Sequence, residues 1–99
     1  MRTNPTLYLV CYDVRDDKRL RRVYKIMRGF GDHIQYSVFR CVLSPRQFEQ
    51  LRQRLLEVVN CDEDQVLLIP LGRASAKRAW RVHVIGTPLT NPERVVRVF

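Results

Sequence analysis

One carboxylate in the sequence lies where it could hold a metal ion. Asp13 closes an apolar, β-rich run that begins at Leu7, and arginines crowd the segment that follows. A hard oxygen ligand beside cations could place Mg²⁺ next to a phosphate, where the ion would activate a water and stabilise charge on the phosphoryl oxygens. A carboxylate at a strand end is more often a turn residue. Both interpretations of Asp13 are open on its position alone.

The segment after Asp13 is the densest basic part of the chain. Apolar residues recur at helical spacing from Leu20 to Met27, which predicts an amphipathic helix with the cations opposite its apolar stripe. Only Asp16 and Asp17 oppose these cations, whereas a solvated helix face normally mixes both signs. We therefore favour binding of nucleic-acid phosphates over a plain solvated face. The cations are Arg15, Lys18, Arg19, Arg21, Arg22, Lys25 and Arg28.

The overall charge agrees with that preference. Eighteen Lys and Arg against ten Asp and Glu give a net charge of +8 on 99 residues, enough for one domain. Such a field favours nucleic acid first and an acidic membrane surface second, with a merely basic protein as the plain alternative. No apolar run approaches the roughly 18 residues of a membrane span. No signal peptide is visible at Met1–Thr6, so we expect a cytoplasmic protein.

Other kinds of site have little support in the sequence. The three cysteines, Cys11, Cys41 and Cys61, are odd in number and form no CxxC pair, which argues against a disulfide framework or a zinc ribbon. His33 and His83 are isolated from other candidate ligands. The stretch Arg28–Gly31 matches the opening of the RNA-recognition-motif signature, but it follows the first helix and is better interpreted as that helix's end.

The pattern of elements predicts an α+β fold of the ferredoxin-like βαββαβ type. Ser44, Pro45 and Gln47 have the spacing of a capping box at the start of a second helix. Pro70 cannot donate to a sheet, so the last strand either ends there or lies at an edge. The expected strands are Leu7–Asp13, two short strands between His33 and Leu43 that meet near Ser37, and Val66–Ile69.

The same pattern predicts a homodimer. Two helices cover one face of the sheet, and the other face keeps apolar side chains with no helix left to cover it. Trp80–Gly86 is a further strand with no partner in a four-stranded sheet. A symmetric dimer with this strand crossing over would satisfy both features and could bring two Asp13 side chains together. We assign residues 1–86 to one domain and residues 87–99 to a C-terminal tail.

Specific residues resemble the small CRISPR-associated endoribonucleases of the Cas-two family. They are Tyr12-Asp13-Val14 followed by Asp16 and Asp17, the run from Lys18 to Val23, Gly31, and Ile34-Gln35-Tyr36-Ser37-Val38-Phe39. A weaker likeness extends through Val66–Leu71 to Val82–Gly86. Arg15 and Phe30 depart from the residues common in the family, and neither departure removes a candidate ligand.

The resemblance implies a ferredoxin-like homodimer in which Asp13 binds a divalent metal at the dimer interface, Mg²⁺ or alternatively Mn²⁺. It implies a metal-dependent nuclease on RNA or DNA, supported by Tyr12, Ser37 and Phe39. It also implies a central dimer in the complex with the Cas-one integrase during spacer acquisition. Two alternatives stay open: a non-catalytic scaffold that holds duplex DNA for that integrase, and a general RNA-binding ferredoxin-like module.

Overall fold

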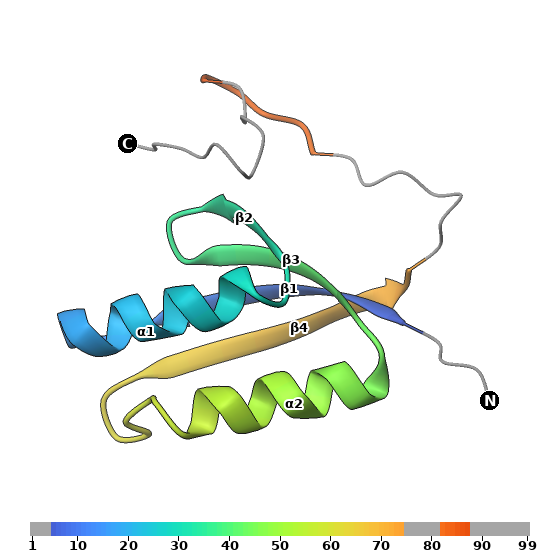
Figure 1. The fold of residues 1–99 in the computed structure, drawn as a ribbon. Helices are drawn as coiled ribbons and strands as arrows, with labels where there is room; N and C mark the ends of the chain where they lie inside the picture. Colours follow the sequence, from blue (N-terminus) through green and yellow to red (C-terminus); the bar gives the residue numbers. More distant parts are fainter. Residues whose placement is uncertain (1–4, 75–81, 88–99) are drawn as a thin grey trace.

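The computed structural model describes residues 5–74 and 82–87, and its elements follow the predicted order. The four strands form one antiparallel sheet in the order β2-β3-β1-β4, with β1 in the interior. This is the ferredoxin-like arrangement predicted from the sequence (Figure 1). The elements are β1 (Thr6–Asp13), α1 (Asp17–Arg28), β2 (Asp32–Gln35), β3 (Val38–Leu43), α2 (Pro45–Leu56) and β4 (Gln65–Arg73).

Both helices begin at the residues whose side chains can cap them. The Asp16 carboxylate accepts hydrogen bonds from the backbone N–H groups of Lys18 and Arg19, each at 3.0 Å. Ser44 and Gln47 form the predicted capping box, in which each side chain accepts the other residue's backbone N–H. These bonds satisfy N–H groups that a helix start otherwise leaves without partners. Local sequence therefore fixes where each helix starts.

The stretch Arg28–Gly31 is the end of α1, as predicted. Gly29 caps the helix, and the backbone N–H groups of Phe30 and Gly31 both donate to the Met27 carbonyl. A Cβ atom at Gly31 would collide with the carbonyl oxygen of Arg40 and with Cys41 Sγ. The glycine therefore lets the chain turn directly against β3 before it starts β2.

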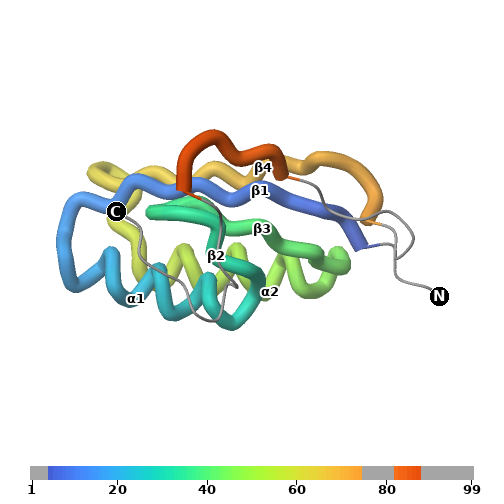
Figure 2. The backbone as a smooth tube through the Cα atoms, turned by 90° about the horizontal axis from the view of Figure 1, so that it is seen from above, coloured from blue at the N-terminus to red at the C-terminus, as the bar shows by residue number. Residues whose placement is uncertain are grey.

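The core lies between the sheet and the two helices, which both pack on one face of it (Figure 2). Alternate residues of β1 and β3 point to this face and are buried, because successive side chains of a strand point to opposite sides. Helix α1 contributes Val23 and Met27, and α2 contributes Leu51 and Leu55. The fully buried side chains are Val10, Val23, Met27, Phe39, Cys41, Leu43 and Leu51.

The opposite face of the sheet, which we call the open face, is apolar and uncovered by any helix of the described chain (Figure 2). Leu9 and Cys11 of β1 point to it, next to Ile69 and Leu67 of β4. Leu67 is 45% exposed, Ile69 38% and Val42 of β3 38%. These aliphatic side chains come from β3 and β4, on either side of β1, and lie on the same face of the sheet.

β4 is longer than the sequence predicted. It continues past Ile69 and Pro70 to Arg73, with a register shift opposite Leu7 and Tyr8. Pro70 is tolerated because β4 is an edge strand, so the missing N–H breaks no ladder on the outer side. Of the two outcomes predicted for Pro70, the edge position is the one observed.

The described part of the segment predicted as a further strand pairs with no strand among the residues that the structure describes. Trp80 and Arg81 lie outside the described residues, and residues 82–87 are exposed and form no regular structure. A strand needs a neighbour to bond with, so a crossover strand stays a prediction about the dimer. Within the described ranges, no helix is long and apolar enough to cross a membrane.

Candidate functional site

Asp13 is the last residue of β1 and is exposed. Because side chains alternate along a strand, Asp13 shares the open face with Leu9 and Cys11. Gln65, the first residue of β4, lies directly opposite Asp13 in the register. The sequence reasoning missed Gln65, since only strand pairing brings these two residues together. Two oxygen-bearing side chains therefore lie at the rim of the apolar face.

The chain by itself offers few ligands for a cation. No group of three or more His, Cys, Asp or Glu side chains that could hold a metal occurs among the described residues. Mg²⁺ usually keeps several waters and binds through one or two carboxylates. An exposed Asp13 beside the Gln65 amide fits half of such a site.

Tyr12, Ser37 and Phe39 lie close to Asp13 in the chain or the sheet, but the two aromatic side chains face the helices. Tyr12 and Phe39 are buried, with ring centroids 6.2 Å apart. The Tyr12 backbone N–H donates to the Ser37 carbonyl at 3.1 Å. Burial raises the pKa of the Tyr12 hydroxyl to about 12, so it is protonated at neutral pH. These residues are placed to hold the end of β1 rather than to contact a ligand of Asp13.

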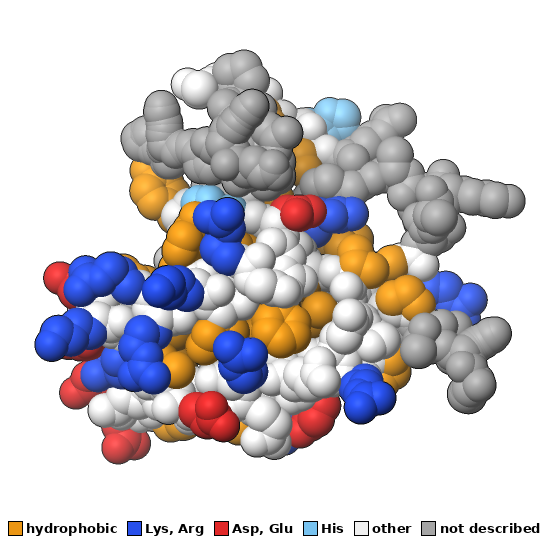
Figure 3. Space-filling view, viewed as in Figure 1, with side chains coloured by type: hydrophobic (Ala, Val, Ile, Leu, Met, Phe, Trp, Pro, Cys, Tyr) orange, Lys and Arg blue, Asp and Glu red, His pale blue; other side chains and the backbone are white. Residues whose placement is uncertain are grey.

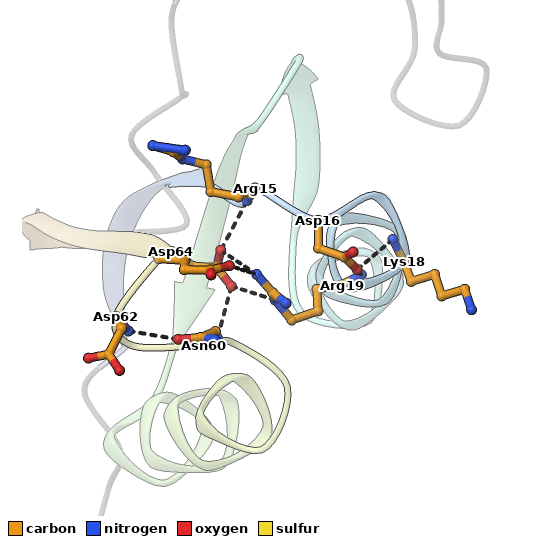
Figure 4. A network of polar contacts seen from close by, with 8 residues as sticks. Arg15, Asp16, Lys18, Arg19, Asn60, Asp62 and Asp64 are labelled. Carbon is orange, nitrogen blue, oxygen red and sulfur yellow. Dashed lines mark hydrogen bonds and ion pairs between the residues drawn. The ribbon is translucent and has the colours of Figure 1, made fainter.

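Arg19, predicted as a phosphate-binding residue, is held by two carboxylates that come just before β4 (Figure 4). Its Nε donates to Asp64 at 2.8 Å and its Nη2 donates to Glu63 at 3.0 Å. The Asp64 side chain is fully buried and also accepts the backbone N–H groups of Arg15 and Asn60. A carboxylate with this many donors is a fixed structural centre.

Because Arg19 pairs with Asp64, fewer cations of the basic run are available to bind a ligand than the sequence alone indicated. The sequence reasoning set only Asp16 and Asp17 against the basic run, whereas Glu63 and Asp64 also face it. The two acids are more than 40 residues away from Arg19 in the sequence, so no local pattern reveals the contact. Through the Arg15 backbone N–H, the pair also fixes the loop between Asp13 and α1.

The Asp64 pair predicts a specific pH dependence of stability. The hydrogen bond from Arg19 holds the pKa of the Asp64 carboxyl well below its usual range, with help from the Asn60 and Arg15 N–H groups. Because the pKa of Asp64 is lower in the folded than in the unfolded chain, its ionised carboxylate stabilises the fold above about pH 4, the pKa of the unfolded chain. This stabilisation is lost as the pH falls below that value. Thermal unfolding of wild type and Asp64→Asn should therefore differ most at neutral pH and converge in acid. Asp62→Asn, an exposed change in the same turn, is the control. A constant difference between wild type and Asp64→Asn from pH 7 to acid would contradict this assignment.

The remaining cations form a basic surface over α1 (Figure 3). Arg28 is partly engaged, because its Nη1 donates to the Tyr24 hydroxyl at 3.3 Å and its guanidinium lies over the Tyr24 ring. The side chains of Arg15 and Lys18 point away from the Asp64 centre (Figure 4). We define the α1 basic surface as the exposed residues Arg15, Lys18, Arg21, Arg22, Lys25 and Arg28.

Comparison with known proteins decides the family. The family described as CRISPR associated protein Cas2 matches residues 6–79. The chain belongs to the Cas2 family. A Cas2 protein named "CRISPR-associated endoribonuclease Cas2 2", from Thermodesulfovibrio yellowstonii, is 45% identical over 64 residues, which cover 65% of this chain and 70% of that protein. Another, "CRISPR-associated endoribonuclease Cas2 3" from Synechocystis, is 37% identical over 87% of this chain and 91% of its own.

Solved structures agree with the Cas2 assignment. The crystal structure of a hypothetical protein, TT1823 from Thermus thermophilus, is 32% identical, with a TM-score of 0.71 over 86% of this chain and 96% of that one. A crystal structure of Cas2 from Streptococcus pyogenes is 34% identical, with a TM-score of 0.62 over 67% of this chain and 86% of that one. The resemblance inferred from Tyr12–Val14 and Ile34–Phe39 is thereby confirmed.

Proposed function

We propose that this Cas2-family chain is a homodimeric, Mg²⁺-dependent phosphodiesterase that cleaves RNA or DNA in CRISPR adaptation. Asp13 supplies the metal ligand, and the α1 basic surface binds phosphates. One observation carries the proposal: Asp13 lies at the rim of an exposed apolar sheet face, on the same side as Leu9 and Leu67. The names of the curated relatives, endoribonucleases of CRISPR systems, support the reaction class.

A second copy of the chain is the partner that best fits the open face. Its Leu67, Ile69 and Val42 side chains are exposed, and covering them would remove apolar surface from water at roughly 25 cal/mol per Å². A two-fold arrangement presents the same patch from both copies, so an apolar face meets an apolar face. With the two-fold axis beside the Asp13 end of the face, the same arrangement also places a second Asp13 near the first. Both the incomplete ligand set and the uncovered surface are then satisfied by one partner.

The residues have distinct roles in the proposed reaction. Asp13 from each copy would hold Mg²⁺, with the Gln65 amide oxygen beside it, and bound Mg²⁺ supplies an activated water and charge neutralisation at the phosphate. The exposed cations of α1 hold the nucleic-acid backbone. Arg19 binds Asp64, and Asp64 in turn accepts the backbone N–H of Arg15 and so positions the loop that carries Arg15. None of these proposed roles is a contact with a base edge, so we expect the protein to bind nucleic acid with weak sequence preference.

The basic surface predicts a salt dependence of binding. On duplex DNA, log K should fall with log [salt] with a slope of roughly −0.9 per neutralised phosphate. Replacing exposed Arg21 and Arg22 by Ala should flatten that slope by about 2 for each copy that contacts the duplex, equally on unrelated sequences. Arg46→Ala with Arg54→Ala, two exposed arginines of α2, is the matched control and should leave the slope unchanged. Equal slopes for wild type and the Arg21/Arg22 variant would place the binding surface elsewhere.

A second candidate function keeps the same dimer without cleavage. In it the basic surface holds duplex DNA for the Cas-one integrase, as the central dimer of a spacer-acquisition complex. The observation that favours it is the ligand set, since the described part of one chain groups no three metal-binding side chains. Holding a duplex requires charge and shape but no metal.

Cleavage assays separate the two functions. Purified protein is incubated with labelled RNA, single-stranded DNA and duplex DNA, in Mg²⁺ or in excess chelator. The phosphodiesterase proposal expects products that appear with Mg²⁺ and disappear with chelator. Retention of duplex with no product from any substrate would favour the scaffold. Cleavage that is equal in Mg²⁺ and in chelator would contradict metal dependence.

A further inference from the structure

Tyr36 has an unusual backbone conformation for a bulky residue. It is the first residue of the two-residue loop, Tyr36–Ser37, that joins β2 to β3. Its φ is 40°, and it is the one non-glycine residue with positive φ in the part of the chain that the structure describes. Tight hairpin loops require positive φ at their first position, which favours Asn, Asp or Gly. A large aromatic residue there is an outlier.

The surrounding chain holds the loop in this conformation. His33 Nε2 donates to the Tyr36 carbonyl at 2.7 Å, and the Tyr12 N–H donates to the Ser37 carbonyl. The Tyr36 residue is 68% exposed, so much of its surface is open to solvent. A strained conformation that the neighbouring structure enforces is typical of ligand-binding sites.

The loop lies at the same end of the sheet as Asp13. The hydrogen bond from Tyr12 to Ser37 joins the loop to the residue just before Asp13. Figure 1 shows the β2–β3 turn, the end of β1 and the start of α1 at this end of the sheet. Arg15 follows within two residues of Asp13 and is exposed. An exposed tyrosine, an exposed aspartate and an exposed arginine therefore lie at the same end of the sheet.

We propose that the Tyr36 ring stacks on an unpaired nucleobase of the strand whose phosphates reach Asp13. The inference rests on the proposed function and adds the class of ligand to it: single-stranded nucleic acid or an unpaired end. Bases inside a duplex are already stacked on one another, whereas an unpaired base exposes its face to an aromatic side chain. Every base has such a face, so this contact is tolerant of sequence.

The test separates the ring from the loop conformation. Tyr36→Asn removes the ring and places a residue that tolerates positive φ, and Tyr36→Phe keeps the ring. Binding is measured with a labelled single-stranded oligonucleotide and with the same sequence as a blunt duplex. Tyr36→Asn should bind the single strand roughly 5- to 100-fold more weakly, as expected for loss of one stacked base. Its duplex affinity and its dimer mass should be unchanged, and its unfolding temperature should equal or exceed that of wild type. Tyr36→Phe should bind both ligands as wild type does.

Several outcomes would overturn the inference. Equal single-strand affinity in wild type and Tyr36→Asn would show that the ring does not contact a base. A fall to monomer mass in Tyr36→Asn would assign the ring to the contact between copies. If binding depends on Arg21 and Arg22 but not on Tyr36, the stacking inference fails while the proposed function stands. If wild type binds neither ligand, both fail.

Discussion

We expect Asp13→Asn to abolish the proposed Mg²⁺-dependent cleavage while leaving the fold, the proposed dimer and nucleic-acid binding in place. The amide keeps the size of the side chain but removes the charge that attracts a hard cation, and a dimer loses two such charges at one site. We expect cleavage to fall by more than about 100-fold, because a metal supplies several kcal/mol of transition-state stabilisation and each 1.36 kcal/mol is a factor of ten. Asp13 is exposed at a strand end, so stability should change little.

The control for this variant is Asp62→Asn, which removes one exposed carboxylate from the turn before β4. It should cleave as wild type does. Binding by Asp13→Asn should hold or rise slightly, because an anion beside phosphates has been removed. Undiminished cleavage by Asp13→Asn would mean that Asp13 is a turn residue or that the nuclease is a contaminant.

We expect Leu67→Lys to separate the proposed dimer and to abolish cleavage without unfolding the chain. Leu67 is 45% exposed on the open face, so the lysine is solvated in the monomer but would be buried between two copies. Burying an unpaired charge costs several kcal/mol, which corresponds to a dimer weaker by about 100-fold or more. Sedimentation should show a folded monomer at micromolar concentration. Cleavage should be lost as well, because the second Asp13 is no longer present.

The matched control is Leu56→Lys. Leu56 is 48% exposed and lies on α2, away from the sheet face. A lysine at this similarly exposed position should leave the mass of the dimer and the rate of cleavage unchanged. Dimerisation that survives Leu67→Lys would show that the copies do not meet through the open face.

Most of the fold could be predicted because its signals are local. The Asp16 cap, the Ser44 capping box and the glycine-rich end of α1 each depend on residues only a few positions apart. The apolar run from Leu7 to Tyr12 predicted a central strand that is covered on both faces. β1 is an interior strand, but the described helices cover only one face of its sheet. Pro70 predicted that the last strand ends there or lies at an edge. β4 is an edge strand, and it continues past Pro70 to Arg73.

The site was harder to predict because its contacts are distant in sequence. Arg19 looked like any other cation of the basic run until Asp64, 45 residues later, was placed against it. Gln65 reaches Asp13 only through the pairing of β1 with β4. The positive φ of Tyr36 depends on a two-residue hairpin that the sequence predicted only as a bend near Ser37. Strand pairing and loop conformation, rather than composition, determine these three features.

The central claim is that two Asp13 side chains share one metal ion across the dimer. The most direct measurement is the stoichiometry of Mn²⁺, used in place of Mg²⁺, bound to purified wild type and to Asp13→Asn in the absence of nucleic acid. The account predicts one ion per two chains in wild type and none at this site in Asp13→Asn, with both proteins dimeric. One ion per chain, or wild-type binding retained by Asp13→Asn, would contradict it.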